Sequence, residues 1–499
     1  MYSKINSEYP FIKISILLGI IIGAVMAFLL SSALLGFSVF AVFICAGFLW
    51  NQYEPPVFPF CFAYQFAFIV SGYIFFLSYE YYPRLVFIGD IEKAVLFSVI
   101  GLIFVFIGIR TALSFFNKTI LKKRKLNIQN VQYFIPVLFW VVIITNLVNL
   151  FVSINPNAVS ITGSQYIQYA LSFRNVFVFL LFLEILKQRK GYKYGLLAFF
   201  FILIPTFASF FSDFKYIFFI IAIIVASEIK PAKFSRFAKN RNRIIILSFL
   251  ALLVSLFIFA LYWEGGVKEK WRGSLKEGSV QGTPLRKAEQ FGEHLKTAHE
   301  NFNFESNLES LSARLSSGLG YFSYVVQRVP KLVPHEDGAL TKRALEHVFK
   351  PRILFPNKPS LGGDSWLVRK YAGLWVAGEE LNTSIALGYI PEFYIDYGIY
   401  GIIFLSLFYG LIVGLLYKSF ILVSPSYNLY FSTSSIFLLN CFSTFEGEIA
   451  KLLGGMVVNF IIFFILLKYF GRFFHQKIMP KKRFSQFPVT KTHSFQELN

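Results

Sequence analysis

The segment Lys350–Tyr400, KPRILFPNKPSLGGDSWLVRKYAGLWVAGEELNTSIALGYIPEFYIDYGIY, joins a polar, proline-rich stretch to the beginning of a long apolar run. Three prolines alternate in it with the cations Lys350, Arg352 and Lys358. Prolines fix φ and remove backbone N–H donors, so this spacing predicts a stiff, extended loop rather than a helix. The segment therefore marks a boundary at which a polar region meets a membrane-spanning region.

The composition is that of a membrane protein. Of the 499 residues, 56% are hydrophobic and only 15% are charged, whereas soluble domains carry about 25% charged residues. The formal net charge is +21, but the basic residues are clustered between apolar runs and do not form the patch typical of nucleic-acid binding. Such clusters indicate membrane topology and contact with anionic lipids. We therefore expect membrane lipids, and no nucleic acid, as partners.

Long apolar runs predict an all-α polytopic fold with about 12 transmembrane helices, because each span needs about 20 apolar residues. The first run resembles a cleaved signal peptide, but a second run follows at once and favours an uncleaved helical hairpin. Two GxxxG pairs, Gly19/Gly23 and Gly410/Gly414, predict close helix packing. The predicted spans are residues 14–30, 33–50, 57–78, 94–114, 131–152, 171–186, 194–211, 214–228, 244–262, 392–417, 428–445 and 451–469.

Basic loops predict the orientation. Four strongly basic segments alternate with loops that are almost free of lysine and arginine, and with twelve spans all four fall on the side of both termini. Because basic loops stay in the cytoplasm, both termini are predicted there and Trp263–Pro391 outside. The basic segments are Arg110–Lys125, Lys187–Lys193, Lys230–Arg243 and Lys481–Arg483.

Four parts of the chain follow from this orientation. Residues 1–262 are predicted to form a transmembrane bundle with spans 1–9, and residues 263–391 one large, partly helical extracytoplasmic loop domain between spans 9 and 10. Residues 392–470 contain spans 10–12, and residues 471–499 form a basic cytoplasmic tail. Within the loop domain, apolar residues recur at steps of three and four over residues 308–326, which predicts a helix.

Cations near the outer interface are candidate phosphate ligands. Arg352 and Lys358 lie in the proline-rich loop, and Arg314 lies on the flank of the helical apolar stripe. At the depth of the lipid headgroups, arginine offers a planar fork and lysine a point charge to phosphate oxygens. Arg174, alone at the interface before the sixth span, is a further candidate. The alternative for each is an ordinary solvated or snorkelling side chain.

Two carboxylates, Glu392 and Asp396, are spaced i, i+4 at the start of the tenth span. Acids at that depth are unfavourable unless they are wet or paired, so they indicate a cavity or a partner. One of them is a candidate general base, and the alternative is that both pair with Arg352 or Lys358. The sequence has no CxxC, HExxH or glycine-rich nucleotide motif, so no metal and no cofactor are expected.

Three motifs occur in the order ESLSARLS (Glu309–Ser316), PRILFPNKPSLGG (Pro351–Gly363) and NTSIALGYIPEFYIDYGIYG (Asn382–Gly401). In this order the chain resembles the bacterial oligosaccharide repeat-unit polymerases, the Wzy-type O-antigen and exopolysaccharide polymerases. The resemblance covers the outer segment and the tenth span. Elsewhere the agreement is limited to a polytopic architecture.

The resemblance implies a glycosyltransferase of the bacterial plasma membrane. Such an enzyme moves a glycan from undecaprenyl diphosphate to the terminal sugar of another lipid-linked unit at the outer face, without a nucleotide sugar or a metal. Arginine and lysine would stabilise the leaving diphosphate, and a carboxylate or His347 would accept the proton of the acceptor hydroxyl. A flippase and a chain-length regulator are the candidate protein partners.

Other interpretations remain open. An O-antigen ligase would share the topology and the donor and would differ in its acceptor. A glycosyltransferase of the GT-C type carries its catalytic acid in the first outer loop, which here is only Ser31–Ser32. A flippase or transporter would favour charges in span centres or paired broken helices, and the sequence has no clear inverted pair.

Overall fold

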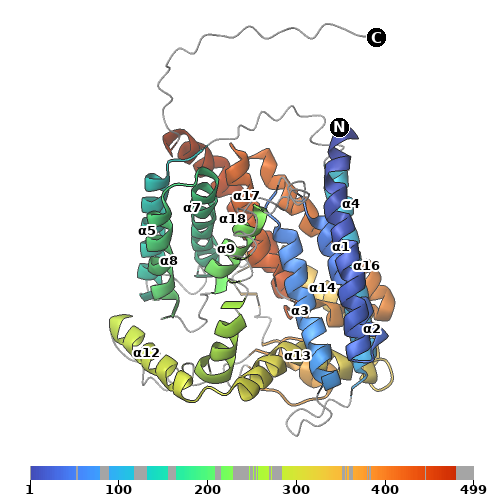
Figure 1. Ribbon diagram of the computed structural model, residues 1–499. Coiled ribbons are helices and arrows are strands. Elements are labelled where there is room, and N and C mark those ends of the chain that lie inside the picture. The colour runs from blue at the N-terminus through green and yellow to red at the C-terminus, as the bar shows by residue number, and fades with distance from the viewer. Residues whose placement is uncertain are drawn as a thin grey trace, which may run out of the picture.

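The structure is a computed structural model, and its described residues form a helical protein without a β-strand (Figure 1). The described residues are 2–51, 54–78, 89–116, 132–154, 164–207, 215–228, 247, 251, 254–255, 257–268, 271, 284–350, 354–355, 357–358, 363–378, 380, 384–443 and 445–478. The proline-rich loop is described at Lys350 and at residues 354, 355, 357 and 358, and none of these is helical. The N–H of Lys358 donates to the carbonyl of Phe355 at 3.1 Å, so this part forms a turn and is not extended.

The helices divide into a bundle and an outer segment. The bundle consists of α1 (Tyr2–Leu29), α2 (Ala33–Leu49), α3 (Val57–Ser78), α4 (Ile91–Phe116), α5 (Ile135–Ile154), α6 (Ser164–Ser172), α7 (Arg174–Gln188), α8 (Tyr192–Phe207), α9 (Lys215–Ser227), α16 (Tyr389–Ser419), α17 (Tyr427–Phe442) and α18 (Ile449–Ile478). The outer segment contains a π-helical turn (Trp263–Val267), α12 (Pro284–Glu300), α13 (Phe304–Arg328), α14 (Ala339–Phe349), α15 (Ser365–Leu367) and a second π-helical turn (Val368–Ala372). A 3-10 turn, Phe420–Leu422, extends α16.

Seven of the described helices are long and apolar enough to cross a membrane. Their surfaces expose large apolar side chains, among them Phe28, Phe404 and Phe408, which are 85%, 59% and 62% exposed. A protein surface with so many exposed phenylalanines requires contact with lipid rather than water. An all-α membrane architecture is therefore confirmed. In each of the predicted spans, all or some of the residues that the structure describes are helical. The number of twelve spans and the side of the membrane on which each loop lies stay predictions.

The chain's terminal helices end at one end of the bundle, and the helices of the outer segment lie at the other (Figure 1). The beginning of α1 and the last turn of α18 lie at the upper end of the view, whereas α12 and α13 lie across the lower end. This arrangement agrees with a chain whose termini share one side of the membrane and whose large loop occupies the other.

Thiol labelling tests that sidedness. We expect Ser306→Cys, exposed at the start of α13, to react with a membrane-impermeant maleimide in intact cells or spheroplasts, and Gln476→Cys, exposed at the end of α18, to react only after lysis. The three native cysteines are buried and free, so they give little background. Labelling of Gln476→Cys alone before lysis would reverse the predicted orientation.

Glycines allow the central helices to touch. A Cβ atom on Gly410 of α16 would lie 2.1 Å from the carbonyl oxygen of Val105, and one on Gly108 of α4 would lie 2.2 Å from the facing backbone. The other GxxxG pair packs α1 on α2, where a Cβ on Gly23 would lie 2.7 Å from the carbonyl oxygen of Gly36. The packing role predicted for both pairs is confirmed.

The helix predicted from the apolar stripe is present as α13. Asn303 caps it, since its side-chain oxygen accepts the backbone N–H of Ser306 at 3.0 Å. Leu311, Leu319 and Phe322 of the stripe are buried, and the helix packs against α3 and α4. The outer segment is therefore docked directly on the bundle.

A kink divides α16 between Tyr397 and Gly398. Gly398 has φ +62° and ψ −145°, values that suit glycine, and this interrupts the helix. The carbonyl of Ile395 instead accepts the backbone N–H of Glu336 at 3.0 Å. The kink therefore separates a short first segment of α16, which faces the outer segment, from the longer remainder of the span.

Candidate functional site

The start of α18 and the connection that precedes it are contacted by three segments that are separate in the sequence. Glu446 pairs with Arg314 of α13. The backbone N–H of Ile449, the first residue of α18, donates to Glu392 of α16. In the first turn of α18, Lys451 forms an ion pair with Asp364. These contacts join segments far apart in the sequence at one end of α18.

The outer carboxylate cluster, as we call it, comprises Asp364, Glu392, Glu448 and Lys451. The three acids are 6%, 2% and 4% exposed, and Lys451 lies at the rim with its side chain 43% exposed. Asp364 and Glu448 thus share one lysine, and Glu392 lies beside Glu448. This arrangement favours retention of at least one proton. The cluster combines buried acids with one partly exposed edge.

Glu392 has a defined partner within the cluster. Its Oε1 accepts the N–H of Ile449 at 3.1 Å, which places the carboxylate at the N-terminus of α18. Backbone N–H groups at a helix start favour an acceptor there. Burial of Glu392 is therefore offset in part by capping, and the side chain also lies beside Glu448.

Glu448 is the least satisfied acid of the cluster. Its Oε2 is buried and has no hydrogen-bond partner among the described residues, and the nearest cation, Lys451 Nζ, is 3.9 Å away. Removal from water, followed by the neighbouring Asp364 carboxyl, raises the pKa of Glu448 above its ordinary value. The positive charges of Lys451 and Arg343 oppose that rise. A carboxyl of this kind can exchange a proton close to neutral pH, as general acid–base catalysis requires.

Arg343 adds a cation beside the cluster. It lies on α14, with its guanidinium carbon 4.9 Å from the ring centroid of Trp366, and its charge acts on Glu448. Stacking on an aromatic face fixes the orientation of the guanidinium plane. The region therefore holds acids and cations close together.

The comparison with family models decides the family. The model of the domain of unknown function DUF8712 matches residues 96–484, well over half of the chain. The chain belongs to the DUF8712 family. The DUF8712 region begins within α4 and includes α13, α14, α16 and α18, so it contains every residue of the outer carboxylate cluster. No curated protein matches the chain, and no solved structure matches it.

Asp396 has a structural partner in this DUF8712 chain. It is fully buried, and its carboxylate accepts the backbone N–H groups of Leu340 and Thr341 at 3.0 and 2.8 Å, and the hydroxyl of Thr341 at 2.5 Å. Asp396 therefore caps α14 from across the fold. Pairing of Asp396 with Lys358 was one interpretation of the sequence. The structure instead gives Asp396 these partners on α14, and Lys358 donates to the carbonyls of His347 and Lys350.

The other predicted site residues lie in three places. Arg314 forms a bidentate pair with Glu446, at 2.9 and 2.8 Å, with its side chain 44% exposed. Arg174 donates to Asn146 Oδ1 and to the carbonyl of Leu171, both at 3.2 Å. His347 is half-buried on α14. Arg352 lies outside the described residues.

Three members of the cluster were missed by the site prediction. Glu448, Asp364 and Lys451 carry only a weak sequence signal, an acid and a lysine spaced i, i+3 where the last apolar run begins. The remaining contacts of the cluster have no local sequence pattern, because Asp364 and Glu392 contact α18 from more than fifty residues away in the sequence. Glu392 is the predicted site residue that the structure places inside the cluster.

Replacing Asp396 tests whether it is structural. We expect Asp396→Ala to lower the free energy of unfolding by about 2–3 kcal/mol, because it leaves buried N–H groups without an acceptor. Asp90→Ala is a matched control, since Asp90 caps α4 by accepting the N–H of Lys93 but is 33% exposed. The control should lose less than about 1 kcal/mol. Denaturation of the purified variants measures both, and equal stability of Asp396→Ala and the native protein would contradict the capping role.

Proposed function

We propose that the chain polymerises undecaprenyl-diphosphate-linked oligosaccharide repeat units at the outer face of the bacterial plasma membrane. The observation that carries the proposal is the outer carboxylate cluster, where a poorly satisfied buried acid, Glu448, lies beside cations at the end of α18. The cluster lies at the junction with the segments that resemble the polymerases. The proposed enzyme is a glycosyltransferase that uses a polyprenyl-diphosphate donor.

The reaction transfers the glycan between two lipid-linked units. The terminal hydroxyl of the acceptor attacks the anomeric carbon of the donor glycan, a new C–O bond forms, and the bond to the diphosphate oxygen breaks. The hydroxyl proton passes to Glu448, and the undecaprenyl diphosphate leaves with its charge. Glu392 stays at the start of α18, where its carboxyl accepts the N–H of Ile449. The neighbouring Asp364 carboxyl favours the protonated form of Glu448.

Cations on the donor side would stabilise the leaving diphosphate. Arg314 presents a fork that already binds one carboxylate, Glu446, in bidentate fashion, and a phosphate can occupy the same geometry. Arg343 and Lys451 flank the base. We keep three further cations as candidate ligands of the diphosphate or its lipid end, namely Arg352, Lys358 and Arg174. His347 is an alternative general base.

Loss of the gene tests the reaction class. Because a polymerase acts after the repeat unit has crossed the membrane, a deletion strain is expected to accumulate lipid-linked single units that an impermeant lectin or glycosidase reaches in spheroplasts. A flippase acts earlier, so its loss would leave the units protected inside. A ligase would give long lipid-linked chains that never reach their final acceptor. Protected units, or long chains, in the deletion strain would each refute the polymerase.

A further inference from the structure

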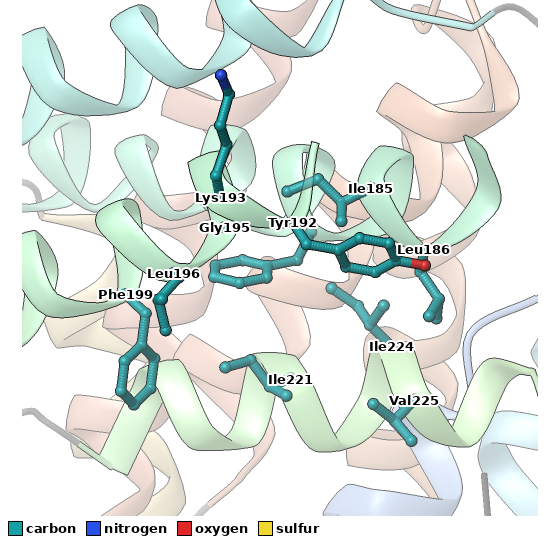
Figure 2. A pocket seen from close by; sticks show the side chains of 11 residues that line it. Ile185, Leu186, Tyr192, Lys193, Gly195, Leu196, Phe199, Ile221, Ile224 and Val225 are labelled. Atoms are coloured by element: carbon teal, nitrogen blue, oxygen red, sulfur yellow. The ribbon is translucent and has the colours of Figure 1, made fainter. Parts of the chain in front are cut away.

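A pocket of about 500 Å³ lies between α7, α8 and α9, away from the outer carboxylate cluster (Figure 2). A volume of this size lies within the range of small-molecule sites. Apolar side chains from all three helices form most of its wall, among them Phe182, Ile185, Leu196, Phe199, Ile221 and Ile224. A pocket with such a wall suits a hydrocarbon chain.

The pocket is open to the lipid-facing surface. Leu196 and Tyr192 belong to its wall and are also 60% and 61% exposed. Leu197 and Phe200 continue the exposed apolar surface of α8, at 57% and 56%. Because this surface lies against lipid in a membrane protein, a lipid chain can enter the pocket from the side without passing through water.

Positive charge lies at one end of the pocket. Lys193 is part of the lining, and Figure 2 shows its ammonium group pointing away from the apolar side chains. Arg189 and Lys190 are exposed in the same short connection between α7 and α8. An apolar pocket with Lys193 at its rim and two more cations in the adjoining connection matches a molecule with a hydrocarbon tail and an anionic head.

The charged rim lies at the end of the bundle opposite the outer carboxylate cluster. Gln188, the last residue of α7, donates to the carbonyl of Tyr133, and the Tyr133 hydroxyl contacts His475 near the end of α18 at 2.9 Å. The outer carboxylate cluster lies instead at the beginning of α18. The 30 residues of α18 therefore separate the two places, and the pocket is distinct from any donor site at that cluster.

We propose that this pocket binds an acyl chain of an anionic phospholipid, whose phosphate is held by Lys193 together with Arg189 and Lys190. The proposal does not depend on the polymerase reaction. The lipid belongs to the leaflet at the end of the bundle where α18 finishes, and it fills the space between α7, α8 and α9.

Photo-crosslinking tests the proposal with the full-length protein in nanodiscs. The probes are phosphatidylglycerol and phosphatidylcholine with the same diazirine-bearing acyl chain, used in equal amounts, and labelled peptides are mapped by mass spectrometry. We expect phosphatidylglycerol to label peptides of α7, α8 and α9 more than phosphatidylcholine does. Lys193→Gln should reduce labelling by phosphatidylglycerol about fivefold and leave phosphatidylcholine unchanged, the effect of about 1 kcal/mol per basic residue.

A matched control separates headgroup recognition from general surface charge. Lys468→Gln removes an exposed lysine from α18 that lies 5.2 Å from the ring of the following tyrosine, as Lys193 does. This control should leave the labelling unchanged. Val225→Phe narrows the pocket and should reduce labelling there by both lipids. Equal labelling by the two lipids, equal effects of the two lysine variants, or no label on α7–α9 would each refute the proposal.

Discussion

Replacing Glu448 by glutamine is expected to slow chain growth by about 10²–10⁴-fold, the contribution typical of a general base. Glutamine is nearly the same size and shape as glutamate but cannot take the proton of the acceptor hydroxyl. The protein should remain in the membrane at its normal level, because the affected Oε2 makes no hydrogen bond within the described residues. A ladder of surface glycans, or the rate with purified protein, measures the effect.

The matched control is Glu92→Gln. Glu92 is also a glutamate near the start of a long apolar helix, since it lies in the first turn of α4, but it is exposed. Removing its charge should leave chain growth within about twofold of normal, since exposed surface substitutions have small effects. Normal ladders from Glu448→Gln at normal protein level would remove Glu448 from the mechanism.

The pH dependence of the rate tests the role of Glu448 as general base independently. Activity should be lost as pH falls through the raised pKa of Glu448, because the protonated carboxyl cannot act as a base. The positive charge of Lys451 lowers that pKa. Lys451→Met should therefore move the acidic limb of the profile to higher pH, whereas Lys451→Arg should leave it in place. An acidic limb unaffected by Lys451→Met would contradict the assignment.

Arg314→Gln is expected to reduce chain growth by about 10²-fold, as when one donor to a developing charge is removed, whereas Glu446→Gln should retain activity. The donor diphosphate must displace Glu446 from the guanidinium fork, so a weaker competitor makes binding easier and should lower KM for the donor. A purely structural ion pair would behave differently, because the two substitutions break the same contacts.

Kinetics of the two variants, at equal protein level, distinguish these cases. Equal losses for Arg314→Gln and Glu446→Gln would assign the pair to the packing of α13 on the connection before α18. Arg314→Lys adds a further test, since it keeps the charge and removes the bidentate geometry. We expect it to lose most of the activity.

Local patterns in the sequence were enough to predict the helices. The apolar stripe of α13, the glycine pairs and the positions of the apolar runs all depend on residues within a few turns of one another. The cap that Asp396 provides for α14 could not be predicted, because its partners lie 55 and 56 residues away. The i, i+4 spacing at the start of a span made Glu392 and Asp396 candidates for one general base, yet the two carboxylates cap two different helices.

The cluster was only partly predictable for the same reason. Glu392 was a candidate because an acid at the beginning of a span is unusual. Glu448 acquires its raised pKa from burial and from Asp364, and neither is visible in the residues next to it in the sequence. The kink at Gly398 also depends on context, since the freed carbonyl of Ile395 is satisfied by Glu336 from another segment.

The central claim is that this chain alone joins lipid-linked repeat units, and reconstitution tests it most directly. Purified protein in vesicles is supplied with undecaprenyl-diphosphate-linked repeat units and a metal chelator, and the products are separated by size. The account predicts a ladder of lipid-linked chains with release of undecaprenyl diphosphate, and no ladder from Glu448→Gln. If the protein without substitutions leaves only single units, under conditions where native membranes make chains, the account is contradicted.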